Sequence, residues 1–172
     1  DVLFDAYLKE FDASDDVILC VLTRAYHSEA GDWEQFADAR AREQGRPVSE
    51  LPRVWFQPQV PQDDLPSLYA AADTFVLPSR GEGWGRPHVE AMAMAMPVIA
   101  TNWSGPTEYM HPDNSYPLPI QGLTPVRDGP FKGHLWADPS VRELRRLMRE
   151  VFTNRDAAAE KGAQARRDMI KH

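Results

Sequence analysis

The chain has 172 residues, of which 42% are hydrophobic and 26% are charged, and this balance is typical of one folded globular domain. The formal net charge of -7 excludes a general nucleic-acid binder, because such a protein needs a basic surface to displace phosphate counterions. The longest apolar runs, such as residues 17–22, are far too short to cross a bilayer, so we expect no membrane span in this chain.

Cysteine and histidine content argues against disulfide and metal chemistry. Cys20 is the only cysteine and lies in an apolar run, so an internal disulfide is impossible and a reactive thiol is disfavoured. A single thiol fits a reducing, cytoplasmic setting. The histidines have no cysteine companions and no helical zinc spacing, so we expect no metal site among His27, His88, His111, His134 and His172.

Along residues 1–100, hydrophobic residues at helical spacing alternate with short apolar runs. In chain order, this pattern predicts helices over 3–11, 32–44, 63–72 and 87–96 and strands over 17–22, 53–56, 74–77 and 98–100. Pro97 ends the fourth helix, because proline cannot continue a helix.

The second half of the chain is less regular. Residues 102–139 are rich in proline and glycine, which predicts a long irregular segment with one short strand at 134–137. Two closing helices are predicted over 141–152 and 155–170. The inner face of the first closing helix is predicted to consist of Leu144, Leu147, Met148 and Val151.

Short strands that alternate with helices favour parallel pairing through right-handed crossovers. We therefore predict an α/β fold with an open, Rossmann-like, doubly wound parallel sheet. In such sheets ligands bind beyond the carboxyl ends of the strands.

Residues 79–87 join the carboxyl end of the strand at 74–77 to the next helix, so this turn lies where a ligand is expected. Gly81, Gly83 and Gly85 permit left-handed backbone angles and close approach of a ligand to the backbone amides. Pro87 suits the first helical turn. The helix start offers N–H groups and a partial charge of about half a unit, which favour phosphate or sugar oxygens.

Two glutamates flank this turn. Glu90 lies in the first turns of the predicted helix, where a carboxylate suits a ribose diol, and each charged hydrogen bond contributes roughly 1.5–3 kcal/mol. Glu82, on the turn, is placed to contact the next group of the ligand. On these residues alone an alternative stays open, in which Glu90 only complements the helix dipole and Glu82 is solvated. The core-facing side of the helix is predicted to consist of Val89, Met92, Ala93 and Met96.

The segment from Glu82 to Thr101, EGWGRPHVEAMAMAMPVIAT, resembles the Glu-x7-Glu signature of glycosyltransferase family 4, whose enzymes have the two-domain GT-B fold. The resemblance continues upstream over 65–79 and downstream over 104–108 and 136–139, and it spans most of residues 1–172. It implies that the chain is the C-terminal, nucleotide-sugar-binding domain of a retaining glycosyltransferase.

The resemblance also implies the roles of individual residues. Glu82 would be the catalytic residue at the transferred sugar, and Glu90 would hold the ribose hydroxyls of the donor. The implied substrate-binding residues are Glu82, Gly83, Trp84, Gly85, Arg86, Glu90 and Gly105. No bound metal and no cofactor are implied, since the nucleotide-diphosphate sugar is the donor substrate. Catalysis would consist of positioning and of electrostatic stabilisation of an oxocarbenium-like centre and the departing diphosphate.

Four positions depart from the family pattern. Trp84 stands in place of the commoner Phe, and Arg86 occupies a position that is usually Leu. Arg86 either pairs with the donor phosphates or is a solvated guanidinium at the helix start. Ala95 and Ser104 stand where the family has Gly, which puts the local backbone geometry in question.

Domains of this family begin with a strand and a turn that carry an Arg and a Lys for the diphosphate, and no matching segment precedes the first predicted helix. Residues 1–172 are therefore expected to be an incomplete domain, without its first strand and without the N-terminal acceptor domain. Unpaired strand edges, low stability and no sugar transfer by the isolated piece would follow. The expected location is cytoplasmic, with any membrane contact made through the absent domain.

Two other functions stay open at this point. One is a GT-B relative that is not a transferase, such as a nucleotide-sugar epimerase, since a fold does not fix the chemistry. The other is a non-catalytic α/β interaction module with Trp33, Trp55 and Trp136 as surface anchors. Base contacts are expected from the loop at 57–62, which has no diagnostic pattern, so GDP-mannose, UDP-sugars and ADP-sugars all remain possible donors. The acceptor, a sugar, lipid or protein, is not predicted.

Overall fold

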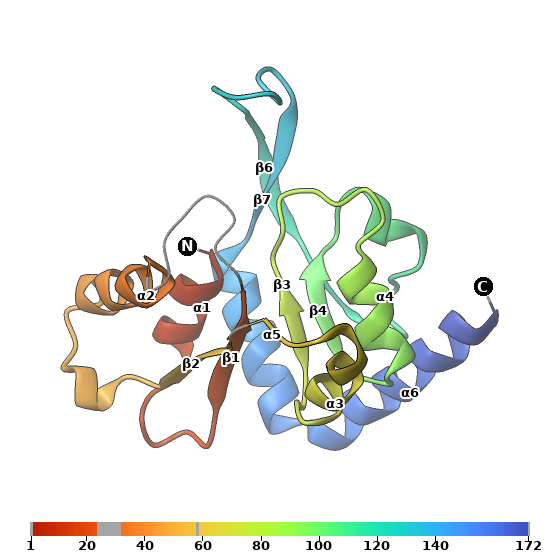
Figure 1. Ribbon diagram of the computed structural model, residues 1–172, viewed down its shortest axis with the longest axis horizontal. Helices are drawn as coiled ribbons and strands as arrows, with labels where there is room; N and C mark the ends of the chain where they lie inside the picture. The colour runs from red at the N-terminus through yellow and green to blue at the C-terminus, as the bar shows by residue number, and fades with distance from the viewer. Residues whose placement is uncertain (1, 24–31, 58, 172) are drawn as a thin grey trace.

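The computed structural model describes residues 2–23, 32–57 and 59–171 (Figure 1). Its α-helices are α1 (Val2–Glu10), α2 (Asp32–Glu43), α3 (Leu65–Ala70), α4 (Arg86–Ala93), α5 (Val141–Thr153) and α6 (Arg155–Lys171). Its strands are β1 (Ile18–Leu22), β2 (Arg53–Gln57), β3 (Phe75–Leu77), β4 (Val98–Thr101), β5 (Tyr116–Leu118), β6 (Ile120–Pro125) and β7 (Leu135–Pro139). Short 3-10 turns cover η1 (Val48–Glu50), η2 (Gln62–Asp64) and η3 (Gly105–Glu108).

The alternation of helices and parallel strands predicted for residues 3–100 is confirmed, although α3 and α4 are shorter than predicted. β1 pairs in parallel with β2, with Ile18 opposite Arg53. β3, β4 and β5 form a second parallel sheet in that order, with Phe75 opposite Val98 and Ile99 opposite Tyr116. Among the described residues the parallel strands thus form a two-stranded and a three-stranded sheet, and β1 and β3 are both edge strands.

The prediction of a largely irregular segment over 102–139 is wrong. This segment contains β5, which extends the parallel sheet, and the antiparallel hairpin of β6 and β7, of which only β7 was expected. Figure 1 shows the hairpin projecting away from the rest of the molecule. Proline and glycine in β5 and β6 mask the strand pattern, and these residues are tolerated because both elements lie at sheet edges and β6 begins with a register shift.

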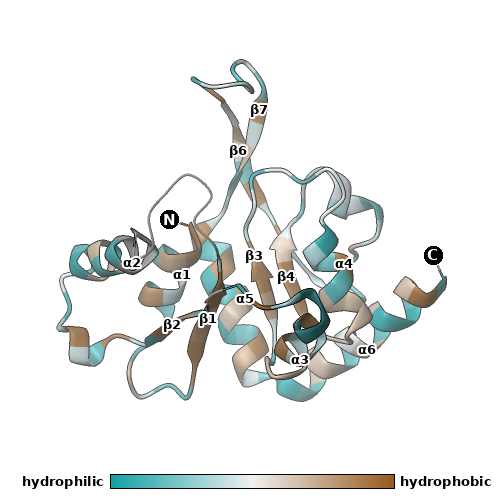
Figure 2. Ribbon diagram, viewed as in Figure 1, coloured by the Kyte–Doolittle hydropathy of each residue, from teal (hydrophilic) through white to brown (hydrophobic). Residues whose placement is uncertain are grey.

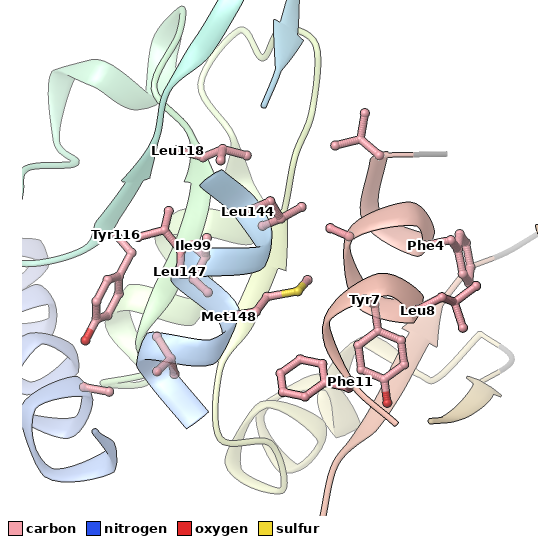
Figure 3. Close-up of a cluster of buried hydrophobic side chains, with 14 residues drawn as sticks. Phe4, Tyr7, Leu8, Phe11, Ile99, Tyr116, Leu118, Leu144, Leu147 and Met148 are labelled. Carbon is pink, nitrogen blue, oxygen red and sulfur yellow. The ribbon is translucent and has the colours of Figure 1, made fainter. Parts of the chain in front are cut away.

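Strand β4 is the centre of the packing. Its four residues are all buried, and successive side chains enter different clusters, because side chains alternate across a strand. Ile99 packs with α5 and β5 (Figure 3), in a cluster that α5 extends to α1, whereas Val98 and Ala100 pack with α4 and α6. Helices therefore cover both faces of this sheet, as a doubly wound fold requires.

The inner face predicted for α5 is confirmed, since all four of its residues are buried: Leu144, Leu147, Met148 and Val151. Apolar residues also dominate the strands, and Figure 2 shows β1 and β3 as largely hydrophobic ribbons. Burial of a Leu or Met side chain contributes about 1.5–3 kcal/mol. The face of α5 is thus a major source of the stability that fixes the strand ends.

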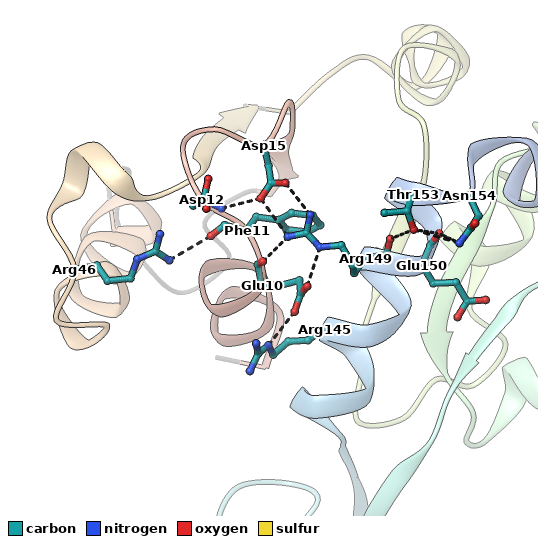
Figure 4. Close-up of polar contacts among 10 residues, drawn as sticks. All are labelled: Glu10, Phe11, Asp12, Asp15, Arg46, Arg145, Arg149, Glu150, Thr153 and Asn154. Atoms are coloured by element: carbon teal, nitrogen blue, oxygen red, sulfur yellow. Dashed lines mark hydrogen bonds and ion pairs between the residues drawn. The ribbon is translucent and has the colours of Figure 1, made fainter.

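Charged contacts join α1 to α5 (Figure 4). The Arg149 guanidinium donates from Nε to Glu10 at 2.9 Å and from Nη1 to Asp15 at 2.7 Å, and its Cζ lies 4.4 Å from the centroid of the Phe11 ring. Arg145 donates to the same Glu10 carboxylate at 3.1 Å. The hydrogen bonds from Arg149 lower the pKa of Asp15. Since both carboxylates lie on or just after α1, this cluster holds α1 against the helix that covers β4 and β5.

Candidate functional site

The predicted glycine-rich turn connects β3 to α4. Gly85 caps α4 with a left-handed backbone, φ 82°, and a Cβ there would lie 2.7 Å from Nδ1 of His88 and 2.8 Å from the hydroxyl of Tyr109. Only glycine fits this position. The amides of His88 and Val89 already donate to the Gly85 carbonyl, at 3.0 and 3.2 Å, and proline has no N–H. A ligand at this helix start can therefore use only amides that precede Pro87.

A second turn, at 104–105, packs directly on the glycine-rich turn. The Gly105 amide donates to the Glu82 carbonyl at 3.0 Å, and the Ser104 hydroxyl donates to the same carbonyl at 2.8 Å. A Cβ on Gly105 would lie 2.1 Å from the carbonyl oxygen of Gly83, so the two backbones touch. The structure thus brings three predicted site residues, Glu82, Gly83 and Gly105, into one contact.

Ala95 and Ser104, the two positions where the sequence lacks an expected glycine, both have left-handed backbones, with φ of 60° and 64°. Ser104 combines this φ with ψ of -148°, a conformation that costs a non-glycine residue about 1–3 kcal/mol. The hydrogen bond from its side chain to Glu82 offsets part of this cost. Ser104, although strained, is therefore one of the residues that fix the orientation of the Glu82 carbonyl.

Glu90 is held by two neighbours. The Tyr69 hydroxyl donates to Oε2 at 3.1 Å, and Arg86 Nη2 lies 3.4 Å from Oε1. The Glu90 side chain is 33% exposed and that of Arg86 is 78% exposed, so both charges remain accessible to a ligand. Burial and the hydrogen bond to Glu90 raise the pKa of Tyr69 to about 12, so this hydroxyl stays a donor.

The core-facing side of α4 differs from the prediction. Met92 and Met96 are buried as expected, but Val89 and Ala93 are only half-buried. Their places are taken by His88 and Ala91, which are fully buried. The helix is rotated relative to the predicted face, because Gly85 starts it with a left-handed residue and turns His88 toward Phe75. Glu90 still lies off the buried side of the helix.

Tyr109 supports the turn from η3. Its hydroxyl donates to the Trp84 carbonyl at 2.5 Å, and its ring lies 5.1 Å from that of Trp84 at an interplanar angle of 58°. Burial, and secondarily the Glu82 charge, raise the pKa of Tyr109 to about 12. Trp84 itself is 54% exposed. A hollow of about 480 Å³ opens beside this pair, lined by Trp84, Val89, Glu108, Tyr109 and Met169.

Neither tyrosine was expected from the sequence. Tyr69 lies 21 residues before Glu90, and Tyr109 lies 25 residues after Trp84. The fold brings them to the turn through α3 and η3. The one local feature that bears on either tyrosine is the position of Tyr69 on the apolar face predicted for its helix, and this feature indicates burial but no contact with Glu90.

His88 is a buried polar group behind the turn. Its side chain is fully buried, neither ring nitrogen has a hydrogen-bond partner, and its ring meets Phe75 edge-on at 5.7 Å. Burial lowers the pKa of His88, so the imidazole is neutral near neutral pH. His88 therefore fills the space under the turn as a neutral imidazole rather than as a charged residue.

Within residues 2–23, 32–57 and 59–171, no group of three His, Cys, Asp or Glu side chains is arranged to hold a metal ion. That finding leaves the prediction of a metal-independent protein untested. Burial raises the pKa of Cys20, which disfavours a reactive thiolate. In the same part of the chain, no helix is long and apolar enough to cross a membrane. Trp55 and Trp136 are exposed, whereas the Trp33 side chain lies outside the described residues.

The family model for glycosyl transferases group 1 matches residues 30–168. The chain belongs to this family. O-antigen chain mannosyltransferase B of Escherichia coli is 58% identical over 43 residues, which are 25% of this chain and 11% of that protein. D-inositol 3-phosphate glycosyltransferase of Salinispora tropica is 36% identical over 92 residues, 54% of this chain and 19% of that protein. The chain thus spans less than a fifth of the length of these curated relatives.

Solved structures show the same fold. The HepE protein of Anabaena, in complex with UDP-glucose, matches with a TM-score of 0.71 at 20% identity, over 99% of this chain and 40% of that chain. The C-terminal domain of the group 1 glycosyl transferase LpcC of Francisella tularensis matches with a TM-score of 0.69 at 19% identity, over 99% of this chain and 76% of that chain. These matches confirm the predicted α/β fold of a GT-B C-terminal domain.

Replacing Gly105 should separate the two turns. We expect Gly105→Ala to lower the free energy of unfolding by about 1–3 kcal/mol, because the added Cβ overlaps the Gly83 carbonyl. Gly81→Ala is the matched control, since a Cβ there meets no atom within 4 Å. Urea unfolding measures both variants, and equal effects of the two substitutions would show that the turns are not in contact.

His88 should make stability depend on pH. The folded state has a lowered His88 pKa and the unfolded state an ordinary one near 6.5, so the unfolded state binds the proton more readily. The contribution of neutral His88 to the free energy of unfolding is complete above pH 6.5, and it declines as the pH falls below that value. We expect His88→Leu to flatten the loss of stability between about pH 7 and pH 5 in urea titrations. His111→Leu, at an exposed site, should leave that slope unchanged; a steeper or unaltered slope in His88→Leu would contradict the assignment.

Proposed function

We propose that this chain supplies the donor site of a retaining glycosyltransferase of family 4, which transfers a sugar from a nucleotide-diphosphate sugar to an acceptor hydroxyl. The observation that carries this proposal is the contact between the two turns, in which the Ser104 hydroxyl and the Gly105 amide both donate to the Glu82 carbonyl. Membership of the group 1 family supports it. Two relatives are named for mannosyl and glycosyl transfer, and one matching structure holds UDP-glucose.

In this proposal Glu90 binds the ribose of the donor. Each oxygen of a carboxylate has two lone pairs, so the contacts to Tyr69 and Arg86 leave one acceptor site on each oxygen for two adjacent hydroxyls. Tyr69 would position the carboxylate without touching the ligand. Arg86, exposed and adjacent to Glu90, would place its charge near the diphosphate, so we propose the phosphate contact rather than a solvated guanidinium.

Glu82 is proposed as the residue that acts at the transferred sugar. The backbone of the turn is fixed by Gly105 and Tyr109, so its carboxylate and the amides of Gly83, Trp84 and Gly85 would be organised before the donor arrives. The acceptor hydroxyl would attack the anomeric carbon on the face from which the nucleoside diphosphate leaves, the bond to the diphosphate oxygen would break, and the hydroxyl proton would pass to that departing oxygen. The protein would stabilise the positive charge at the anomeric carbon and the negative charge on the diphosphate, with no metal ion in the site.

Several predictions about the whole protein stay predictions. They concern a missing first strand with its Arg and Lys, an absent N-terminal acceptor domain, inactivity of the isolated chain and a cytoplasmic location. Within the part of the chain that the structure describes, β1 and β3 each have one unpaired edge, which is compatible with an additional strand. The donor base, the donor sugar and the acceptor are not assigned.

Nucleotide titrations test the two glutamate roles separately. Calorimetry with UDP, GDP, ADP and their glucose or mannose derivatives should identify one nucleotide that binds. Glu90→Gln should weaken binding of the free nucleoside diphosphate by at least about tenfold, because it weakens charged hydrogen bonds to the ribose. Glu82→Gln should leave the diphosphate affinity unchanged and weaken only the nucleotide sugar.

Glu50→Gln, an exposed carboxylate on η1, is the control and should leave both affinities unchanged. No binding of any nucleotide to a longer protein that also contains the expected upstream strand would overturn the proposal. An equal effect of all three substitutions would overturn the assigned roles but not the presence of a nucleotide site.

A further inference from the structure

Helix α4 ends in a tight turn that satisfies some of its last carbonyl groups. The Ala95 amide donates to the Met92 carbonyl at 3.0 Å. One residue further on, the Met96 amide donates to the Ala91 carbonyl at 3.0 Å, and Ala95 itself has a left-handed φ of 60°. These two hydrogen bonds around a left-handed residue form a Schellman motif, which uses the amides that follow the helix.

Arg166 of α6 donates to a carbonyl that this motif leaves over. Four residues after Ala93 comes Pro97, which has no N–H to donate to the Ala93 carbonyl. Arg166 Nη1 donates to this carbonyl at 2.6 Å, and Arg166 is otherwise exposed. The guanidinium charge also lies at the negative end of the α4 dipole, which strengthens the contact. A side chain from another helix thus completes the hydrogen bonding at the end of α4.

Helix α6 makes a second contact with the same end of α4. Gly162 is buried, and a Cβ on it would overlap the carbonyl oxygen of Ala95. Gly162 and Arg166 are four residues apart and therefore lie on the same face of α6. In Figure 1, α6 passes the end of α4 that lies farther from the glycine-rich turn. One close backbone contact and one charged hydrogen bond therefore fix the C-terminal end of α4.

Glu90 lies in the helical turn that Arg166 holds. It comes three residues before Ala93, and its own carbonyl accepts from the Met94 amide at 3.1 Å. α4 has only eight residues, and a helix this short depends on its tertiary contacts. Loss of the contact at Ala93 would let the last turn of α4 fray. The Glu90 carboxylate would then move away from Tyr69, whose hydroxyl donates to it at 3.1 Å.

We propose that Arg166 is a positioning residue of the donor site, which keeps the Glu90 carboxylate in place for the donor ribose. The inference rests on the proposed role of Glu90. Arg166 acts from the far end of α4 and does not touch the ligand. Its contact is a charged hydrogen bond to a carbonyl, so a lysine at this position can keep part of the contact and an alanine cannot.

A double-mutant cycle tests whether Arg166 acts through Glu90. The variants are made in a longer protein that also contains the expected upstream strand, and calorimetry measures the affinity for the nucleoside diphosphate that binds. Arg166→Ala should weaken this affinity by at least about threefold, and Arg166→Lys should restore part of the loss. In a Glu90→Gln background, Arg166→Ala should change the affinity by less than about twofold, because the carboxylate that it positions is gone.

Arg167→Ala is the matched control. Arg167 is the next residue of α6, it is exposed, and its guanidinium donates within the helix to Gln164 at 2.6 Å. We expect this variant to keep the nucleotide affinity of the unaltered protein. Calorimetry also separates positioning from folding. Chains that have failed to fold lower the number of sites per chain, whereas a displaced Glu90 lowers the affinity of each site.

The outcomes distinguish this inference from the proposed function. Unchanged affinity in Arg166→Ala, or a loss that is equally large in the Glu90→Gln background, would overturn the role of Arg166 and leave the donor site intact. An equal loss in Arg167→Ala would assign the effect to the charge of α6 and would also overturn that role. No nucleotide binding by the unaltered longer protein would overturn the proposed function and the inference together.

Discussion

The contact between two backbones, at Gly105 and at Glu82–Gly83, determines the geometry of the whole site. Carbonyl groups of a glycine-rich turn have many accessible orientations, and one backbone amide and one hydroxyl from the second turn select one of them. Ser104 adopts a costly conformation to make its contact. These contacts fix the backbone of Glu82, which sets the point from which its side chain extends.

The packing of the domain places these two turns next to each other. Both follow parallel strands, the half-buried β3 and the fully buried β4, which lie side by side with their carboxyl ends at one edge of the sheet. β4 is covered on one face by α5 and on the other by α4 with α6, so this packing holds its end beside α4. Arg149 and its two carboxylates extend this framework to α1. The strands and helices thus form the base on which the two turns of the candidate site are placed.

Local features of the sequence were sufficient to predict the α/β fold and the position of the turn. Short apolar strands and helical spacing are local patterns, and three glycines in five residues mark a turn wherever they occur. The hairpin of β6 and β7 could not be predicted, because its proline and glycine residues are those of a loop and its strands depend on each other. Tyr69 and Tyr109 could not be predicted either, because their contacts with Glu90 and Trp84 depend on the tertiary fold. The rotation of α4 that buries His88 follows from the left-handed Gly85, which no periodicity argument includes.

The central claim is that a nucleotide sugar binds at the two turns, and amide chemical shifts measure this most directly. In ¹⁵N-labelled chain titrated with the nucleotide sugar that binds, the largest shifts should occur at the amides of 81–86 and 104–105. The hollow between α5 and α6, lined by residues from Phe152 to Ala157, should show none. Shifts that gather at that hollow, or that leave both turns unchanged at saturation, would contradict the claim.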